Sequence, residues 1–176
     1  MADRPLLPSP PVEEILHDRE AVNIAIEEGR HSSLIICETI AALTKLGRFE
    51  ELWKIADSMS KEVSVLVDAE GRVWVDIGTK SSVRLSPAQG SVIPYRLWLH
   101  THPHEAYASQ TDRGTLAGCS MILLEAIVLG HDHMVRLQRK PAGIGRSLED
   151  YGPLSTWTSD EDIVLYSSLK EDYYDR

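Results

Sequence analysis

The sequence contains few cysteines and no long hydrophobic run. Of its 176 residues only Cys37 and Cys119 are cysteines, and such sparse use predicts free thiols in a reducing, cytoplasmic setting. No apolar run approaches the roughly 18 residues of a membrane-spanning helix. The opening residues 1–11, MADRPLLPSPP, also lack the apolar core of a signal peptide. We therefore expect a cytoplasmic protein that has no membrane partner.

Basic residues are scarce relative to acidic ones. The chain has 18 lysines and arginines against 27 aspartates and glutamates, which gives a formal net charge of -9. A surplus of negative charge repels a phosphate backbone, so we expect no nucleic-acid partner. The hydrophobic share of 43% is enough for a single core at this length, which indicates one globular domain.

The first third of the chain predicts a helical extension. Residues 1–11 are rich in proline and are expected to form a disordered lead-in. Apolar residues then recur near helical spacing over residues 12–28, and a second helix is expected after Ser32 or Ser33 as its cap. A third helix has an apolar face formed by Phe49, Leu52, Ile55, Ala56 and Met59. We assign residues 12–60 to the same domain as the segments that follow.

From residue 61 the period changes from helical to alternating, which is typical of strands. The valine-rich runs 63–67 and 73–77 predict a β-hairpin. Further elements are expected downstream, namely strands near 82–86, 95–99, 121–129 and 134–138, and helices over 110–120 and 160–169. Residues 61–140 form the predicted core, and residues 141–176 supply a long loop, the last helix and an acidic tail. The whole predicts an α/β fold in which a mixed β-sheet packs between helices.

Two histidines stand where the predicted strand 95–99 ends. Side chains at i and i+2 of a strand share one face, so His100 and His102 are expected to converge and form half of a metal site. Pro103 then forces a turn, after which Asp112, near the start of the next helix, can supply an oxygen ligand. Two imidazoles and one carboxylate with an open fourth position are typical of catalytic zinc. Two strand histidines at this spacing also occur in plain core packing, which remains the alternative.

The full arrangement resembles a known family. His100-Thr101-His102-Pro103 followed by Ser109-Gln110-Thr111-Asp112 is similar to the signature of the JAMM (JAB/MPN) metalloproteases, which include the JAB domain of RadC-like proteins. The usual pattern has six residues between the proline and the serine, and here there are five. Weaker similarities to RadC-like members are Ile77-Gly78-Thr79 and Gly130-His131-Asp132-His133. The resemblance covers about residues 60–138.

The resemblance implies a fold, a cofactor and a chemistry. The fold would be cytidine-deaminase-like, with one Zn²⁺ per chain held by His100, His102 and Asp112. Glu62 would be the general base, and Ser109 would donate a hydrogen bond to the developing oxyanion, although Ser109 could also simply cap its helix. The implied activity is that of a metallopeptidase or isopeptidase acting next to the C-terminal tail of a ubiquitin-like or sulfur-carrier protein.

Several alternatives stay open at this point. The chain could be a non-catalytic scaffold that keeps the fold, or a RadC-like DNA-associated protein, and a homodimer is an alternative to a monomer. His131 and His133 flank Asp132 and could hold a second metal, but a polar turn between strands is the ordinary interpretation. His104 and Glu105 are left outside the predicted site as solvated turn residues.

Overall fold

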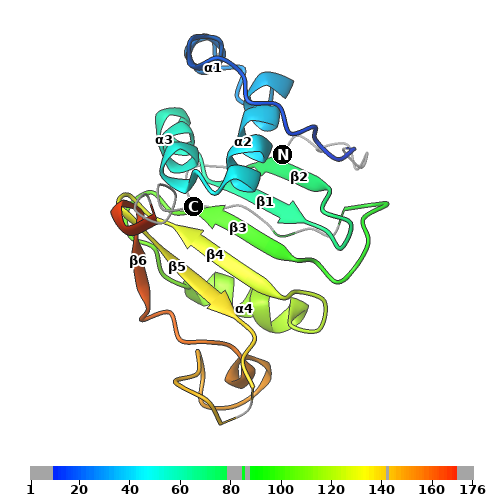
Figure 1. Ribbon diagram of the computed structural model, residues 1–176, viewed down its shortest axis with the longest axis vertical. Helices are drawn as coiled ribbons and strands as arrows, with labels where there is room; N and C mark the ends of the chain where they lie inside the picture. The colour runs from blue at the N-terminus through cyan, green and yellow to red at the C-terminus, as the bar shows by residue number, and fades with distance from the viewer. Residues whose placement is uncertain (1–9, 79–84, 86–87, 142, 170–176) are drawn as a thin grey trace, which may run out of the picture.

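The computed structural model describes residues 10–78, 85, 88–141 and 143–169, and Figure 1 shows one sheet with helices on both sides. Its elements in chain order are α1 Arg19–Glu27, α2 Leu34–Leu46, α3 Phe49–Met59, β1 Val63–Val67, β2 Val73–Ile77, β3 Leu97–Thr101, α4 Gln110–Cys119, β4 Glu125–Leu129, β5 His133–Gln138, the 3-10 helix η1 Pro153–Thr156 and β6 Ile163–Leu165. The predicted α/β class, with N-terminal helices preceding a mixed sheet, is confirmed.

The six strands lie in the order β2-β1-β3-β4-β5-β6. β3 and β4 are parallel, and each other neighbouring pair of these strands is antiparallel. A parallel pair needs a crossover connection, and α4 provides it. The chain therefore leaves the end of β3, crosses one face of the sheet and places the start of α4 beside that strand end, where the predicted ligands lie.

The sheet separates two hydrophobic cores. One core joins residues of α2 and α3 to Val65 of β1, and the other joins Leu66, the next residue, to Leu116 of α4 and to Trp157. All five residues of β1 are buried, because successive side chains point to opposite faces and both faces are covered. Figure 1 shows α1 to α3 on the opposite side of the sheet from α4.

Asp68 organises the turn between β1 and β2. Its buried carboxylate accepts hydrogen bonds from the backbone N–H groups of Glu70, Arg72 and Val92, at 3.0, 2.9 and 3.1 Å. The Arg72 guanidinium donates to the same carboxylate at 2.8 Å. One side chain thus joins the hairpin turn to the segment that leads into β3.

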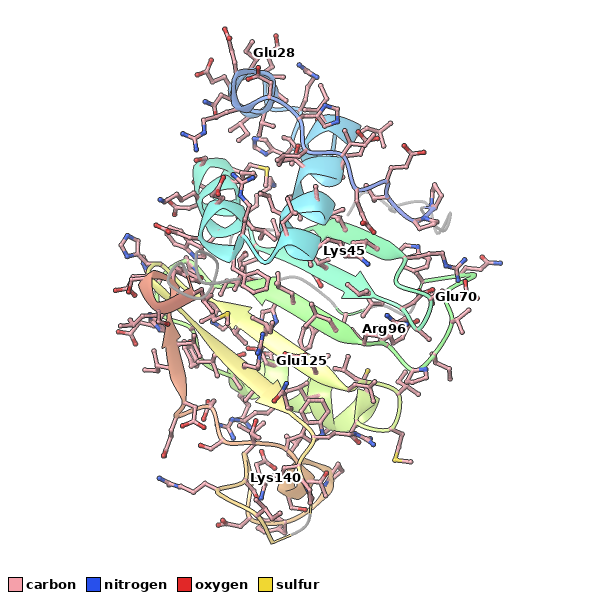
Figure 2. All side chains as sticks on the ribbon, viewed as in Figure 1. Glu28, Lys45, Glu70, Arg96, Glu125 and Lys140 are labelled. Carbon is pink, nitrogen blue, oxygen red and sulfur yellow. The ribbon has the colours of Figure 1, made fainter. Side chains whose placement is uncertain are left out.

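The first helix is shorter than predicted. Residues 12–28 were expected to be helical, but α1 begins at Arg19, after Asp18 has capped it by accepting a hydrogen bond from Glu20 N at 2.7 Å. Val12 instead bonds through its N–H to Val73 O at 2.7 Å, beside the edge strand β2. Lys45 of α2, labelled in Figure 2, pairs with Glu14 at 3.5 Å. A single bridge from Val12 to the sheet edge thus stands where the helix was predicted to begin.

The predicted helix over residues 160–169 is wrong in its first half. Residues 163–165 form β6, which pairs with β5 in the register His133 to Leu165, and helical structure starts only at Tyr166. A free backbone edge on β5 was available to this apolar stretch, and local periodicity does not reveal such a partner. The predicted strand at 82–86 and the tails at 1–9 and 170–176 fall on residues outside the described ones, apart from Leu85.

The remaining elements agree with the sequence within a few residues. β4 starts at Glu125 rather than at Met121, and the region 141–158 is mainly loop around η1. Both cysteines are free, Cys37 in the interior and Cys119 partly exposed. Among the described residues, no helix has the length and apolar character needed to cross a bilayer.

Candidate metal centre

β3 brings the two histidines together as their spacing predicts. Trp98, His100 and His102 project on the same face, so that the Trp98 and His100 rings stack with centroids 4.4 Å apart, and the two imidazole centroids lie 5.1 Å apart. Trp98 is itself fixed by donating from Nε1 to Ser64 Oγ at 3.0 Å. The stacked indole therefore supports one side of the His100 ring.

The start of α4 turns Asp112 back toward these rings. Ser109 is the N-cap of the helix, and its Oγ accepts from Asp112 N at 3.2 Å, while Asp112 Oδ2 accepts from Ser109 N at 2.8 Å. This reciprocal capping box satisfies two N–H groups that the helix leaves unpaired. Because it also fixes the Asp112 side chain, the helix start determines where the carboxylate points.

The carboxylate of Asp112 reaches both histidines. Oδ1 lies 3.0 Å from His100 Nε2, and Oδ2 lies 3.2 Å from His102 Nε2. The three side chains are 2, 10 and 11% exposed for His100, His102 and Asp112. One ligand atom from each residue falls within 4.8 Å of the others, which is the spacing of donors around a single ion.

The His100 nitrogens fit a metal better than they fit a hydrogen bond. His100 Nδ1 and Nε2 are buried, and neither has a hydrogen-bond partner among the described residues. The 3.0 Å approach of Nε2 to Asp112 is thus a close contact without hydrogen-bond alignment. Burial lowers the pKa of His100, which favours the neutral imidazole whose lone pair can bind a metal.

The carboxylate is ionised and ready to bind a cation. Burial alone would raise the pKa of Asp112, but its contacts with His100 and His102 outweigh burial and hold that pKa far below its usual range. Two imidazoles and one carboxylate form a donor set that suits zinc. The three residues could therefore hold one metal ion.

Known proteins offer no further guide. No family model, curated protein or solved structure matches the chain.

Glu62 lies immediately before β1, close to the ligands. The register that pairs Ser64 with His100 brings Glu62, two residues earlier, opposite His102, two residues later. The Glu62 carbonyl accepts from Gly78 N at 2.8 Å, which fixes the backbone there. Burial raises the pKa of the Glu62 carboxyl, His102 lowers it, and Asp112 raises it further, with a net upward shift.

A cavity of about 400 Å³ opens above these groups. Its lining includes all five predicted site residues, namely Glu62, His100, His102, Ser109 and Asp112. A second cavity, of about 280 Å³, shares Glu62, His102, Pro103 and His104 with the first and continues toward α3. The predicted residues thus meet at one hollow on the protein surface.

Sequence reasoning missed several residues that shape the site. Trp53 of α3 donates from Nε1 to the His102 carbonyl at 2.7 Å, and the Tyr107 ring meets the His102 ring edge-on at 5.0 Å. His104 and Glu105, set aside as solvated turn residues, also line the cavity. Tyr107 could have been predicted, because it is an aromatic residue close to the histidine motif. Trp53 could not, because no residue near it in the sequence indicates a contact with His102.

The second histidine pair is not a metal site in this arrangement. His133 Nδ1 lies 2.6 Å from Asp132 Oδ1, and its Nε2 accepts from Ala106 N at 3.1 Å. The His131 ring contacts Trp53 edge-on at 5.1 Å. Within the described residues, the one group placed to hold a metal is that of His100, His102 and Asp112.

Proposed function

We propose that this protein is a zinc-dependent amide hydrolase, a metallopeptidase or isopeptidase that cuts next to the C-terminal tail of a ubiquitin-like or sulfur-carrier protein. One observation carries the proposal. The Asp112 carboxylate faces both His100 and His102 at 3.0 and 3.2 Å, on the wall of a cavity that Glu62 and Ser109 also line. The similarity of these same residues to the JAMM signature supports the choice of reaction and of a cytidine-deaminase-like fold.

His100, His102 and Asp112 would hold the zinc ion. A bound Zn²⁺ supplies Lewis acidity, which polarises a carbonyl group and makes a water molecule easier to deprotonate near neutral pH. The cavity above the three residues leaves room for water and substrate. A structural zinc site would instead be closed by a fourth protein ligand.

Glu62 is the proposed general base. Its carboxylate takes the proton of the attacking water, holds it and passes it to the departing amine. A proton shuttle works best when its pKa is close to the working pH, and the upward shift of the Glu62 pKa, caused first by burial, is in the favourable direction. Removal of this carboxylate is therefore expected to abolish turnover and to leave the three ligands intact.

Ser109 is the proposed oxyanion donor. Its Oγ already accepts a hydrogen bond from Asp112 N, which leaves the hydroxyl proton for an acceptor. In the proposed reaction that acceptor is the substrate carbonyl oxygen as it gains negative charge. The capping role and the oxyanion role are compatible, because they use the lone pair and the proton of the same hydroxyl group.

The joined cavities favour an extended substrate. The smaller cavity begins at Glu62 and His102 and runs toward Asp57 and Ser60 at the end of α3, so that both sides of a cleaved bond have space. An extended C-terminal tail can lie in such a groove, where backbone hydrogen bonds give affinity. This is the basis for proposing a protein tail rather than a compact small molecule.

The test combines metal analysis with one substitution. Elemental analysis of purified protein should find close to one zinc per chain, and Glu62→Gln should keep the zinc while cleavage of ubiquitin-like fusion proteins falls by about 10²-fold or more. The matched control is Glu70→Gln, a turn glutamate that is 61% exposed and should cut like the parent. Protein without metal, or Glu62→Gln that cuts as fast as the parent, would contradict the proposal.

A further inference from the structure

The loop that connects His102 to Asp112 makes a hydrogen bond to another part of the chain at every second residue. His102 N donates to Leu129 O at 2.8 Å, and His131 N donates to His104 O at 2.7 Å. The next contacts in the row are Ala106 N to His133 Nε2 at 3.1 Å and Ala108 N to Asp160 Oδ2 at 3.2 Å. The loop from His102 to Ser109 is thus held in a strand-like row although it forms no strand.

Gly130 shows how closely this row is packed. A Cβ atom at Gly130 would lie 2.5 Å from Ala106 N and 2.8 Å from His104 O, closer than van der Waals contact allows. Backbone therefore lies directly against backbone between residues 104–106 and the turn that begins at Gly130. The Tyr166 hydroxyl, which donates to Gly130 O at 2.8 Å, fixes that turn from the other side.

The contact at Ala106 fixes the chemical state of His133. A backbone N–H can only donate, so His133 Nε2 must be the unprotonated acceptor and the ring proton must sit on Nδ1. That proton faces Asp132 Oδ1 at 2.6 Å, and the same hydrogen bond lowers the pKa of Asp132. The Asp132 carboxylate thus stabilises the His133 tautomer that is protonated at Nδ1, and this tautomer leaves Nε2 free to accept from Ala106 N.

We propose that His133, held by Asp132, is a positioning residue that fixes the loop between His102 and Asp112 through the Ala106 N–H. The inference deepens the proposed function and rests on it where it concerns metal binding. Ala106 is 5% exposed, so loss of the acceptor leaves a buried N–H unpaired, and the loop has to move to find water. Since His102 stands at one end of the loop and Asp112 follows the other, such movement changes the spacing of the ligands.

The experiment uses the full chain and measures the loop directly. Amide exchange at Ala106 is followed by NMR in the metal-free protein, and metal binding is followed separately by the visible absorption of cobalt(II), a probe for zinc sites. His133→Phe keeps a ring but removes the acceptor, and it should speed exchange at Ala106 at least tenfold, weaken cobalt(II) binding roughly tenfold and alter the cobalt(II) absorption bands.

Three further variants separate positioning from packing. His133→Gln restores an acceptor and should bring exchange and cobalt(II) affinity back near the parent values. The Asp132 side chain is 68% exposed, so the Asp132→Ala variant should fold even if His133→Phe does not. This variant should also speed exchange at Ala106. His131→Phe is the matched control, because the loop contact uses the His131 backbone and phenylalanine keeps a ring against Trp53, and it should leave both readouts unchanged.

The outcomes are distinct for the two proposals. The positioning role is overturned if Asp132→Ala and His133→Phe exchange at Ala106 like the parent, if His133→Gln fails to restore slow exchange, or if His131→Phe accelerates it equally. A parent protein that binds no cobalt(II) would overturn the proposed function, while exchange at Ala106 in the metal-free protein would still decide the positioning role.

Discussion

At the scale of single residues, Asp112 serves two purposes with one carboxylate. Oδ2 closes the capping box of α4 by accepting from Ser109 N at 2.8 Å, and both oxygens face the histidines. The helix start thus keeps the carboxylate in place when no ion is present. A ligand already held by the backbone loses less conformational entropy when the ion binds.

Asp112→Asn separates these two purposes. The amide oxygen still accepts from Ser109 N, but the negative charge is lost, so we expect a folded protein whose zinc affinity is at least 10²-fold lower. Chelator competition measures the affinity, and circular dichroism checks the helix content. Zinc affinity equal to that of the parent would show that Asp112 is not a ligand.

At the scale of elements, the β1–β2 hairpin depends on the buried Asp68 carboxylate. Burial by itself would raise the pKa of Asp68, but hydrogen bonds from the Val92 and Arg72 backbone and the Arg72 side chain outweigh burial and lower it. A carboxyl whose pKa is lower in the folded protein stabilises the fold above its unfolded pKa, which is about 4. That contribution is lost as the pH falls through the lower folded value.

The corresponding prediction concerns Asp68→Asn. The neutral amide cannot satisfy all the donors around it, so the free energy of unfolding at pH 7 should fall by about 2–4 kcal/mol. The free energy of unfolding should also decrease less between pH 5 and pH 2 in the variant than in the parent. Urea unfolding at several pH values measures both, with the exposed Asp150→Asn as control. A parent and variant with parallel pH profiles would contradict the assignment.

α3 links the N-terminal extension to the candidate metal centre. Trp53 is 5% exposed, donates to the His102 carbonyl at 2.7 Å and meets the His131 ring edge-on. The extension thus contributes a wall of the second cavity and a direct contact to a ligand residue. α3 is therefore part of the candidate site.

At the scale of the whole molecule, the candidate metal centre joins segments that lie far apart in the sequence. Glu62 precedes the first strand, the histidines end the third, and Asp112 belongs to the crossover helix. Because these segments come together only in the folded state, an ion that binds there stabilises the fold as a whole.

Zinc binding should therefore be visible in thermal unfolding. Zinc at about 1,000 times its dissociation constant would add about 4 kcal/mol to the free energy of unfolding, which at this chain length raises Tm by roughly 8–16 °C. Calorimetry of chelator-treated protein with and without added zinc measures the shift, and Asp112→Asn should lose most of it. An unchanged Tm in the parent would argue against a zinc site.

The sequence by itself determined the elements whose signals are local. α2 ends where Gly47 adopts a φ of 68°, α4 begins at the Ser109 cap, and the hairpin follows its alternating valines. His100 and His102 share a face because strand geometry requires it. Each of these features depends on neighbours a few residues away, so periodicity and capping residues were sufficient to predict it.

Only the tertiary structure decided the features that depend on a distant partner. Val12 and residues 163–165 joined sheet edges that no local pattern reveals, and those backbone hydrogen bonds outweighed helical spacing. The approach of Trp53 and His133 to the ligand loop likewise required α3 and β5 to reach the end of β3. Contacts of this kind depend on the position of backbone far along the chain, which spacing within one segment does not encode.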